Sequence, residues 1–130
     1  MITYDEAQEA LTRIADSIPQ EIYSGLNGGI VLLPESKSHR EARLDDLCIL
    51  GEYHYDPAGL GRYITIYFGS FQRLHSRLSE EAFIDKLREV LYHELTHHLE
   101  HMAGDKSLER RDEEYMERYR LRRRDEDRQS

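Results

Sequence analysis

The most informative segment is HELTHHLEHMAG, which runs from His93 to Gly104. It contains the pattern H-E-x-x-H, with His93 and His97 one helical turn apart. Side chains four residues apart lie above one another on a helix, so both imidazoles can reach one metal ion. Glu94 follows the first histidine, where a carboxylate can take a proton from a metal-bound water. The segment therefore predicts a zinc site with Glu94 as general base.

The flanking residues predict that this segment lies on a helix of about residues 80–103. Ser79 is a good N-cap, acidic residues follow it in the first turn, and Gly104 is typical of a helix end. At 100° per residue the apolar side chains form one broad arc, and Glu94 falls inside it. A buried carboxylate is costly without a partner, and a nearby dication would supply one. The arc comprises Phe83, Ile84, Leu87, Leu91, Leu95, His98 and Met102.

The rest of the chain predicts an α+β fold. Residues 3–17 have helical spacing, with Thr3 as N-cap and Pro19 beyond the end. A last helix over 108–124, capped by Ser107, is expected to fold back antiparallel after a short connector. Three strands are predicted over residues 30–33, 47–53 and 62–68, the last two forming an antiparallel hairpin across the turn at 56–61.

We therefore expect a zincin-like minimal fold, in which a small, mostly antiparallel sheet packs against three helices. These are the N-terminal helix, the H-E-x-x-H helix and the C-terminal helix. A chain of 130 residues, 38% of them hydrophobic, predicts one domain. We place it at residues 1–124, followed by a charged tail at 125–130.

Charge and composition limit the partners. The net charge of −8 is carried by residues 1–104, because residues 105–130 hold nine basic and nine acidic side chains. No basic surface stands free of acids, which argues against nucleic acid. The lone Cys48 lies in an apolar run, the N-terminus has no signal-peptide pattern, and no apolar run approaches a membrane span. We expect a cytoplasmic protein with no membrane partner; the oligomeric state is not predicted.

A catalytic zinc usually takes three protein ligands. His101 lies two turns, about 12 Å, from His93, too far for one ion on a straight helix. If the last helix folds back, His97 lies opposite residues 112–114. Asp112 is also the acid on the inward stripe of that helix, so we predict Asp112 as the third ligand, with Glu109 or Glu113 next.

The proposed chemistry is hydrolysis of a peptide bond in a peptide or protein substrate. Zinc lowers the pKa of its water, Glu94 accepts the proton, and the hydroxide attacks the carbonyl. The candidates for stabilising the oxyanion are Tyr115, Tyr119 and His101. The strand Tyr63–Phe68 is a candidate to hold an extended peptide by strand addition, beside its ordinary role in a sheet. Surface or structural roles are expected for His39, His54 and His75.

These features together resemble the small, single-domain zincin-like metallopeptidases of bacteria. The resemblance covers roughly residues 1–120 and rests on four segments, which are GLNGGIVLLP (25–34), LGEY (50–53), GLGRYI (59–64) and HELTHHLE (93–100). It implies a short sheet beside an H-E-x-x-H helix, with His93 and His97 as metal ligands and Glu94 as general base.

The chain departs from this family at the third ligand. Several minimal zincins have a Gly three residues after the second His and an Asp three residues further on. These positions are Glu100 and Ala103 here, so the assignment of Asp112 comes from helix geometry alone. Two alternatives remain: a catalytically silent zincin fold that binds a metal or a partner, and a structural helical module in which the motif arose by chance.

Overall fold

The computed structural model describes residues 2–38 and 48–104. The chain divides into two compact units, residues 1–98 and 99–130, and of the second the structure describes residues 99–104. The domain predicted at residues 1–124 and the tail at 125–130 stay predictions. In chain order the elements are α1 (Tyr4–Asp16), the 3-10 turn η1 (Gln20–Tyr23), β1 (Gly29–Leu33), β2 (Lys37–Ser38), β3 (Cys48–Ile49), β4 (Gly51–Asp56), β5 (Gly61–Tyr67), α2 (Phe68–His75) and α3 (Glu80–Ala103).

Helix α1 begins as its sequence predicts. The hydroxyl of Thr3 accepts a hydrogen bond from the backbone N–H of Glu6, at 3.2 Å. The Glu6 carboxylate accepts one in return from the backbone N–H of Thr3, at 3.1 Å. This reciprocal capping box satisfies two donors that the first turn would otherwise leave without a partner.

Helix α3 also has the predicted bounds. At its start the hydroxyl of Ser79 accepts a hydrogen bond from the N–H of Ala82, at 3.1 Å. At its end the N–H of Gly104 donates to the carbonyls of Glu100 and His101. The predicted helix over residues 108–124 lies outside the described residues.

The three-stranded sheet has the order β1-β5-β4 and is mixed, which corrects the prediction of a mostly antiparallel sheet. Strands β4 and β5 form the predicted antiparallel hairpin, whereas β1 runs parallel to β5. Strand direction depends on how the long connection crosses the fold, and the residue pattern of a short strand carries no information on it. Because β5 has a neighbour on each side, it cannot accept a peptide strand, and that candidate role is wrong.

Two further local predictions were wrong. The strand predicted at 47–53 is divided at Leu50 into β3, which pairs with β2 in a separate small sheet, and β4. The strand predicted to reach Phe68 ends at Tyr67, where α2 begins. Phe68 and Phe71 are buried three residues apart, a helical spacing that the preceding run of strand-forming residues obscured.

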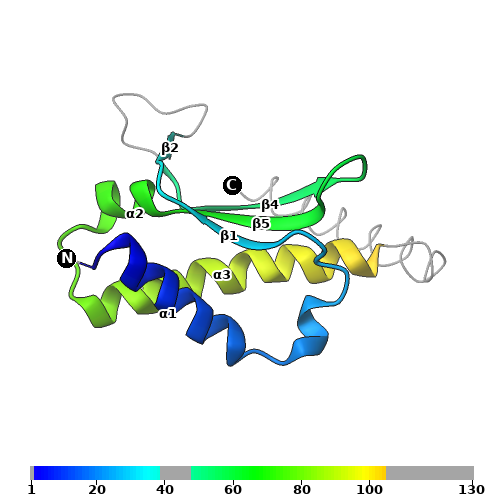
Figure 1. Ribbon diagram of the computed structural model, residues 1–130, viewed down its shortest axis with the longest axis horizontal. Coiled ribbons are helices and arrows are strands. Elements are labelled where there is room, and N and C mark those ends of the chain that lie inside the picture. The colour runs from blue at the N-terminus through cyan, green and yellow to red at the C-terminus, as the bar shows by residue number, and fades with distance from the viewer. Residues whose placement is uncertain (1, 39–47, 105–130) are drawn as a thin grey trace, which may run out of the picture. The chain divides into compact units, whose positions relative to one another are not determined.

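Helices α1 and α3 lie together on one face of the three-stranded sheet, as Figure 1 shows. Alternate residues of β5, Ile64 and Ile66, are fully buried on this face. The coarse fold class is therefore α+β, with the helices on one side of a small mixed sheet. The core combines Ala7, Ala10, Leu11 and Ile14 of α1, Leu32 of β1, Phe68 and Phe71 of α2, and Phe83, Leu87, Val90, Leu91 and Leu95 of α3.

Among the described residues, no helix has both the length and the apolar character needed to cross a membrane.

Replacing Thr3 by alanine removes the side-chain half of the capping box. We expect the free energy of unfolding to fall by about 1 kcal/mol, as measured by urea denaturation. Thr12→Ala in the same helix is the matched control, because the exposed Thr12 hydroxyl donates to the Gln8 carbonyl and accepts a long 3.4 Å bond from the Gln8 side chain, and neither bond caps the helix. The control should change stability by less than about 0.5 kcal/mol. An equal loss in both variants would contradict the capping argument.

Candidate functional site

The residues of the H-E-x-x-H motif divide between the two faces of α3. His93 and His97 are exposed, whereas Glu94 is only 6% exposed and lies on the face that packs against the sheet. This division follows from the helical period, because each residue is turned by about 100° from the one before it. The sequence prediction that Glu94 lies within the core-facing arc is confirmed.

The two exposed imidazoles point at each other's Nε2 atoms. The Nε2 atoms of His93 and His97 are 3.1 Å apart, and the ring planes are nearly perpendicular. Two nitrogens bound to one tetrahedral zinc at about 2.0 Å would be separated by about 3.3 Å. The spacing of the two nitrogens in this pair is therefore close to that of two ligands of a single ion.

Glu94 is held in an environment that disfavours its charge. Burial raises the pKa of the Glu94 carboxyl, and the negative charge of Glu52 adds to this effect. The neighbouring His93 and His97 oppose it and lower the pKa, but burial is the larger influence. A carboxylate whose proton affinity is raised in this way is a better proton acceptor than an exposed one, which suits a general base.

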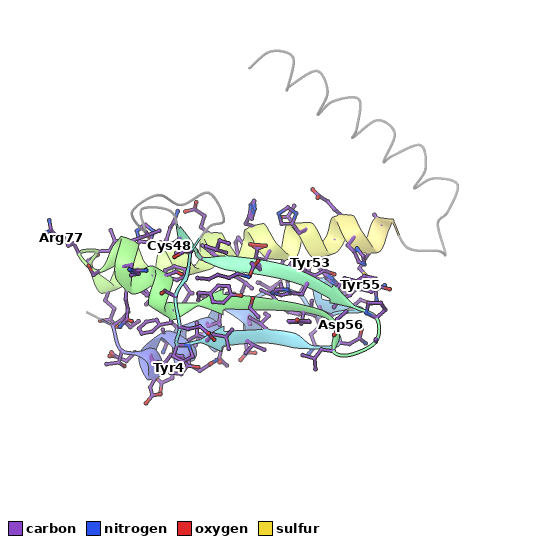
Figure 2. All side chains as sticks on the ribbon, turned by 90° about the horizontal axis from the view of Figure 1, so that it is seen from above. Tyr4, Cys48, Tyr53, Tyr55, Asp56 and Arg77 are labelled. Carbon is purple, nitrogen blue, oxygen red and sulfur yellow. The ribbon has the colours of Figure 1, made fainter. Side chains whose placement is uncertain are left out.

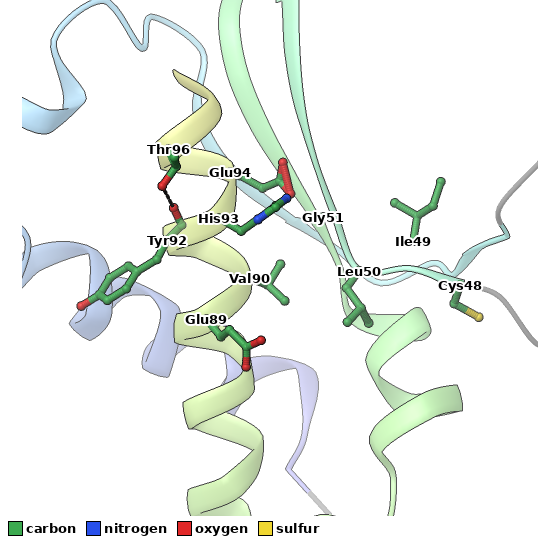
Figure 3. A pocket seen from close by; sticks show the side chains of 10 residues that line it. All are labelled: Cys48, Ile49, Leu50, Gly51, Glu89, Val90, Tyr92, His93, Glu94 and Thr96. Atoms are coloured by element: carbon green, nitrogen blue, oxygen red, sulfur yellow. Dashed lines mark hydrogen bonds between the residues drawn. The ribbon is translucent and has the colours of Figure 1, made fainter. Parts of the chain in front are cut away.

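A cleft of about 490 Å³ opens beside His93 and Glu94, between α3 and the segment Cys48–Gly51 (Figure 3). Its strand wall contributes the aliphatic side chains of Ile49 and Leu50. Its helix wall is more polar. That wall comprises Glu89, Val90, Tyr92, His93, Glu94 and Thr96.

Gly51 allows β4 to approach α3 closely at this cleft. A Cβ atom at position 51 would lie 2.8 Å from Cγ1 of Val90 and 3.3 Å from Cγ of Glu94. The first separation is too short for real carbon atoms, so a side chain at this position would push the strand and helix apart. The missing side chain thus brings the strand over the carboxylate and contributes to its burial.

Strand β4 is an edge strand of the three-stranded sheet, on the side of α3 (Figure 2). Its residue Glu52 points to the other face of the sheet from Gly51. The Glu52 carboxylate accepts hydrogen bonds of 2.6 Å from both Lys37 and the Tyr67 hydroxyl. Burial raises the pKa of Glu52, but these two hydrogen bonds and the charge of Lys37 outweigh it and lower the pKa overall. Glu52 is therefore a stable negative charge near Glu94.

The second histidine of the His97-His98 pair does not lie on the side of α3 that His93 and His97 share. His98 is completely buried, and its Nδ1 and Nε2 lie 2.7 Å from the Tyr53 hydroxyl and 2.8 Å from the Ser24 carbonyl, respectively. Burial lowers the pKa of His98, although the bond to Ser24 opposes this. Sequence reasoning placed His98 in the core-facing arc but missed its partners. The one sign of such a partner in the sequence was Tyr53, which places a hydroxyl on a strand face otherwise turned to the core.

The third ligand is not found among the described residues. Within residues 2–38 and 48–104, no group of three His, Cys, Asp or Glu side chains is placed to hold a metal ion. The predicted ligand Asp112 and its alternatives Glu109 and Glu113 lie outside the described residues, as do Tyr115 and Tyr119. His101 is described, but it is not brought into such a group with His93 and His97.

The remaining histidines were expected to have surface or structural roles. His54 makes a hydrogen bond of 2.8 Å to the hydroxyl of Thr65 and stacks on Tyr63. His75, at the end of α2, packs against Phe71. His39 lies outside the described residues.

Comparison with known proteins identifies a similar solved structure, whose description names no activity. No protein-family model matches the chain, and no curated protein matches it. A solved structure described as a conserved hypothetical protein from Thermo thermophilus is similar, with 31% sequence identity and a TM-score of 0.69. The match covers 78% of this chain and 98% of that one.

The close approach at Gly51 can be tested with a double-mutant cycle. We expect Gly51→Ala to lower the free energy of unfolding by about 1–3 kcal/mol, because its Cβ meets Val90. In a Val90→Ala background the obstructing methyl is gone, so the same substitution should cost about 1 kcal/mol less. Thermal and urea unfolding of the four proteins give this difference. Equal costs in both backgrounds would mean that strand and helix are not in contact there.

Proposed function

We propose that this protein, which belongs to the same family as the conserved hypothetical protein from Thermo thermophilus, is a zinc-dependent peptide hydrolase with a zincin-like fold. The observation that carries the proposal is the convergence of the His93 and His97 Nε2 atoms, 3.1 Å apart, beside a buried glutamate. The two ring nitrogens are within hydrogen-bond distance of each other, and this separation is close to that of two nitrogens on one zinc ion.

The donor set suits zinc. Two neutral imidazoles and a carboxylate are ligands that zinc commonly takes in catalytic sites, with one position left for water. We propose His93 and His97 as two of these ligands and Asp112 as the third. A zinc ion bound there would lower the pKa of a bound water and polarise the substrate carbonyl.

Glu94 performs the proton transfers in this proposal. Its carboxylate lies on the same helix as the two ligands, one residue after His93, and it lines the same cleft. Because burial raises its pKa, it can accept a proton from the attacking water and return it to the leaving amine. The low-polarity surroundings that Gly51 and Val90 provide also strengthen electrostatic interactions with the reacting groups.

The substrate in this proposal is an extended segment of a peptide or protein. In the described part of the sheet, β4 has a neighbour on one side only, and its first residue lines the cleft. A peptide added along this edge would hydrogen-bond to the strand backbone and pass the His93–Glu94 region. We therefore assign to β4 the role that sequence reasoning gave to β5.

The alternative is a zincin-fold protein that binds a metal or a partner and does not hydrolyse peptides. The departure from the family pattern at Glu100 and Ala103 favours it, because a weakly held ion would support little catalysis.

Metal analysis tests the site. We expect about one zinc ion per chain in the purified protein, measured by elemental mass spectrometry. His93→Ala or His97→Ala should abolish stoichiometric zinc, while His75→Ala, a histidine on α2, should leave it unchanged. Asp112→Ala should weaken zinc affinity by at least about tenfold. Unchanged zinc in the His93 and His97 variants would contradict the site, and unchanged affinity in Asp112→Ala would transfer the third-ligand role to Glu109 or Glu113.

Glu94→Gln tests the catalytic role separately from metal binding. We expect the variant to retain zinc but to cleave an unfolded protein such as reduced casein about 10²–10⁴-fold more slowly, because the amide cannot accept the proton. Glu81→Gln, in the exposed first turn of the same helix, is the matched control and should cleave at the wild-type rate. Zinc binding with no cleavage by the wild type would favour the catalytically silent alternative.

A further inference from the structure

We propose that the hydrogen bond between Tyr53 and His98 positions the site, by fixing the rotation and the longitudinal register of α3 against β4. His98 and Tyr53 are then positioning residues for Glu94 and for the His93–His97 pair. The functional meaning of that pair rests on the proposed function, but the contacts that carry this inference involve only the chain's own residues.

The hydrogen bonds of His98 define one tautomer of its neutral ring, the form that burial favours by lowering the pKa of His98. The carbonyl of Ser24 can only accept, so Nε2 of His98 carries the proton and donates across 2.8 Å. Nδ1 is then an acceptor, and the Tyr53 hydroxyl donates to it across 2.7 Å. Both ring nitrogens are engaged, so His98 is no metal ligand, and its ring is held between two separate segments of the chain.

The spacing of residues on the strand matches the spacing on the helix. Gly51 and Tyr53 are two residues apart on β4 and pair with Ile66 and Ile64, so both face the helices. Two strand residues span about 6.7 Å, and four helix residues span about 6 Å. Glu94 and His98 are four residues apart on α3. The hydrogen bond between Tyr53 and His98 therefore also sets the position of Glu94, four residues earlier on the helix, beneath Gly51, two residues earlier on the strand.

A metal site requires this degree of control. An atom about 6 Å from the helix axis moves by about 1 Å when the helix turns by 10°. Metal–ligand distances tolerate only about 0.2 Å. The neighbouring core contacts of α3 are aliphatic, and aliphatic packing fixes direction less strictly than hydrogen bonds do.

A histidine at a fully buried core position also needs a reason. An apolar side chain would fill the same place without the cost of desolvating two ring nitrogens. Here the two hydrogen bonds offset that cost and add a defined direction. The adjacent histidines thus have different tasks: His97 lies with His93 on the exposed side of α3, and His98 anchors the helix from its buried side.

Tyr53→Phe tests the inference, because it removes one hydroxyl and retains the ring. Tyr4→Phe is the matched control: the Tyr4 hydroxyl also donates to a partly buried acceptor, the Leu32 carbonyl, at 2.6 Å, but it lies on α1. We expect Tyr53→Phe to lower zinc affinity about tenfold in a chelator competition and to shift the visible spectrum of the cobalt-substituted protein. Tyr4→Phe should change neither.

A metal-free measurement separates this inference from the proposed function. In the protein without metal, the imidazole ¹⁵N chemical shifts of His93 and His97 should change in Tyr53→Phe and not in Tyr4→Phe. His98→Asn, whose side-chain oxygen can still accept from Tyr53, should keep both shifts closer to wild type than Tyr53→Phe does. His98→Leu, which removes both hydrogen bonds, should change both shifts and replaces Tyr53→Phe as the test should that variant fail to fold. Absence of zinc binding in the wild type would refute the proposed function alone. Unchanged His93 and His97 shifts in folded Tyr53→Phe would refute the positioning role.

Discussion

The close contact between β4 and α3 is the constraint on which the site depends. Because position 51 carries no side chain, the strand can lie against Val90 and the Glu94 methylene groups. That contact buries a carboxylate and raises its pKa, and it leaves an open cleft beside His93. A bulkier strand residue would widen the gap, admit water to the carboxylate and lower its proton affinity. Gly51 therefore affects both the packing of β4 on α3 and the proton affinity of Glu94.

The two glutamates near this contact have opposite environments. Hydrogen bonds from Lys37 and Tyr67 keep Glu52 ionised, so it contributes a fixed negative charge on the outer face of the sheet. Glu94 of α3 faces the sheet, where burial favours its protonated form. Pairs of carboxyl groups whose pKa values are separated in this way are common where one of them must exchange protons. The acidic character of residues 1–104 adds an attraction for cations to this arrangement.

The sequence was most informative where structure is decided locally. The caps at Thr3 and Ser79 and the inward placement of Glu94 depend on residues within a few positions, and all were predicted. The parallel pairing of β1 with β5 and the bond between Tyr53 and His98 join segments far apart in the chain. No local pattern encodes such pairings. Helix α2 was missed for a different reason, because its apolar start continues a run typical of strands.

The parallel pairing of β1 with β5 also affects how the chain acquires its structure. Gly29 of β1 pairs with Tyr63 of β5, which comes much later in the chain. The apolar side chains of α1 pack with those of α3, which follows later still. During synthesis, α1 and β1 therefore leave the ribosome well before their partners exist. The apolar surface of β1 remains accessible to chaperones or to other nascent chains until β5 has been made, and that of α1 until α3 has been made.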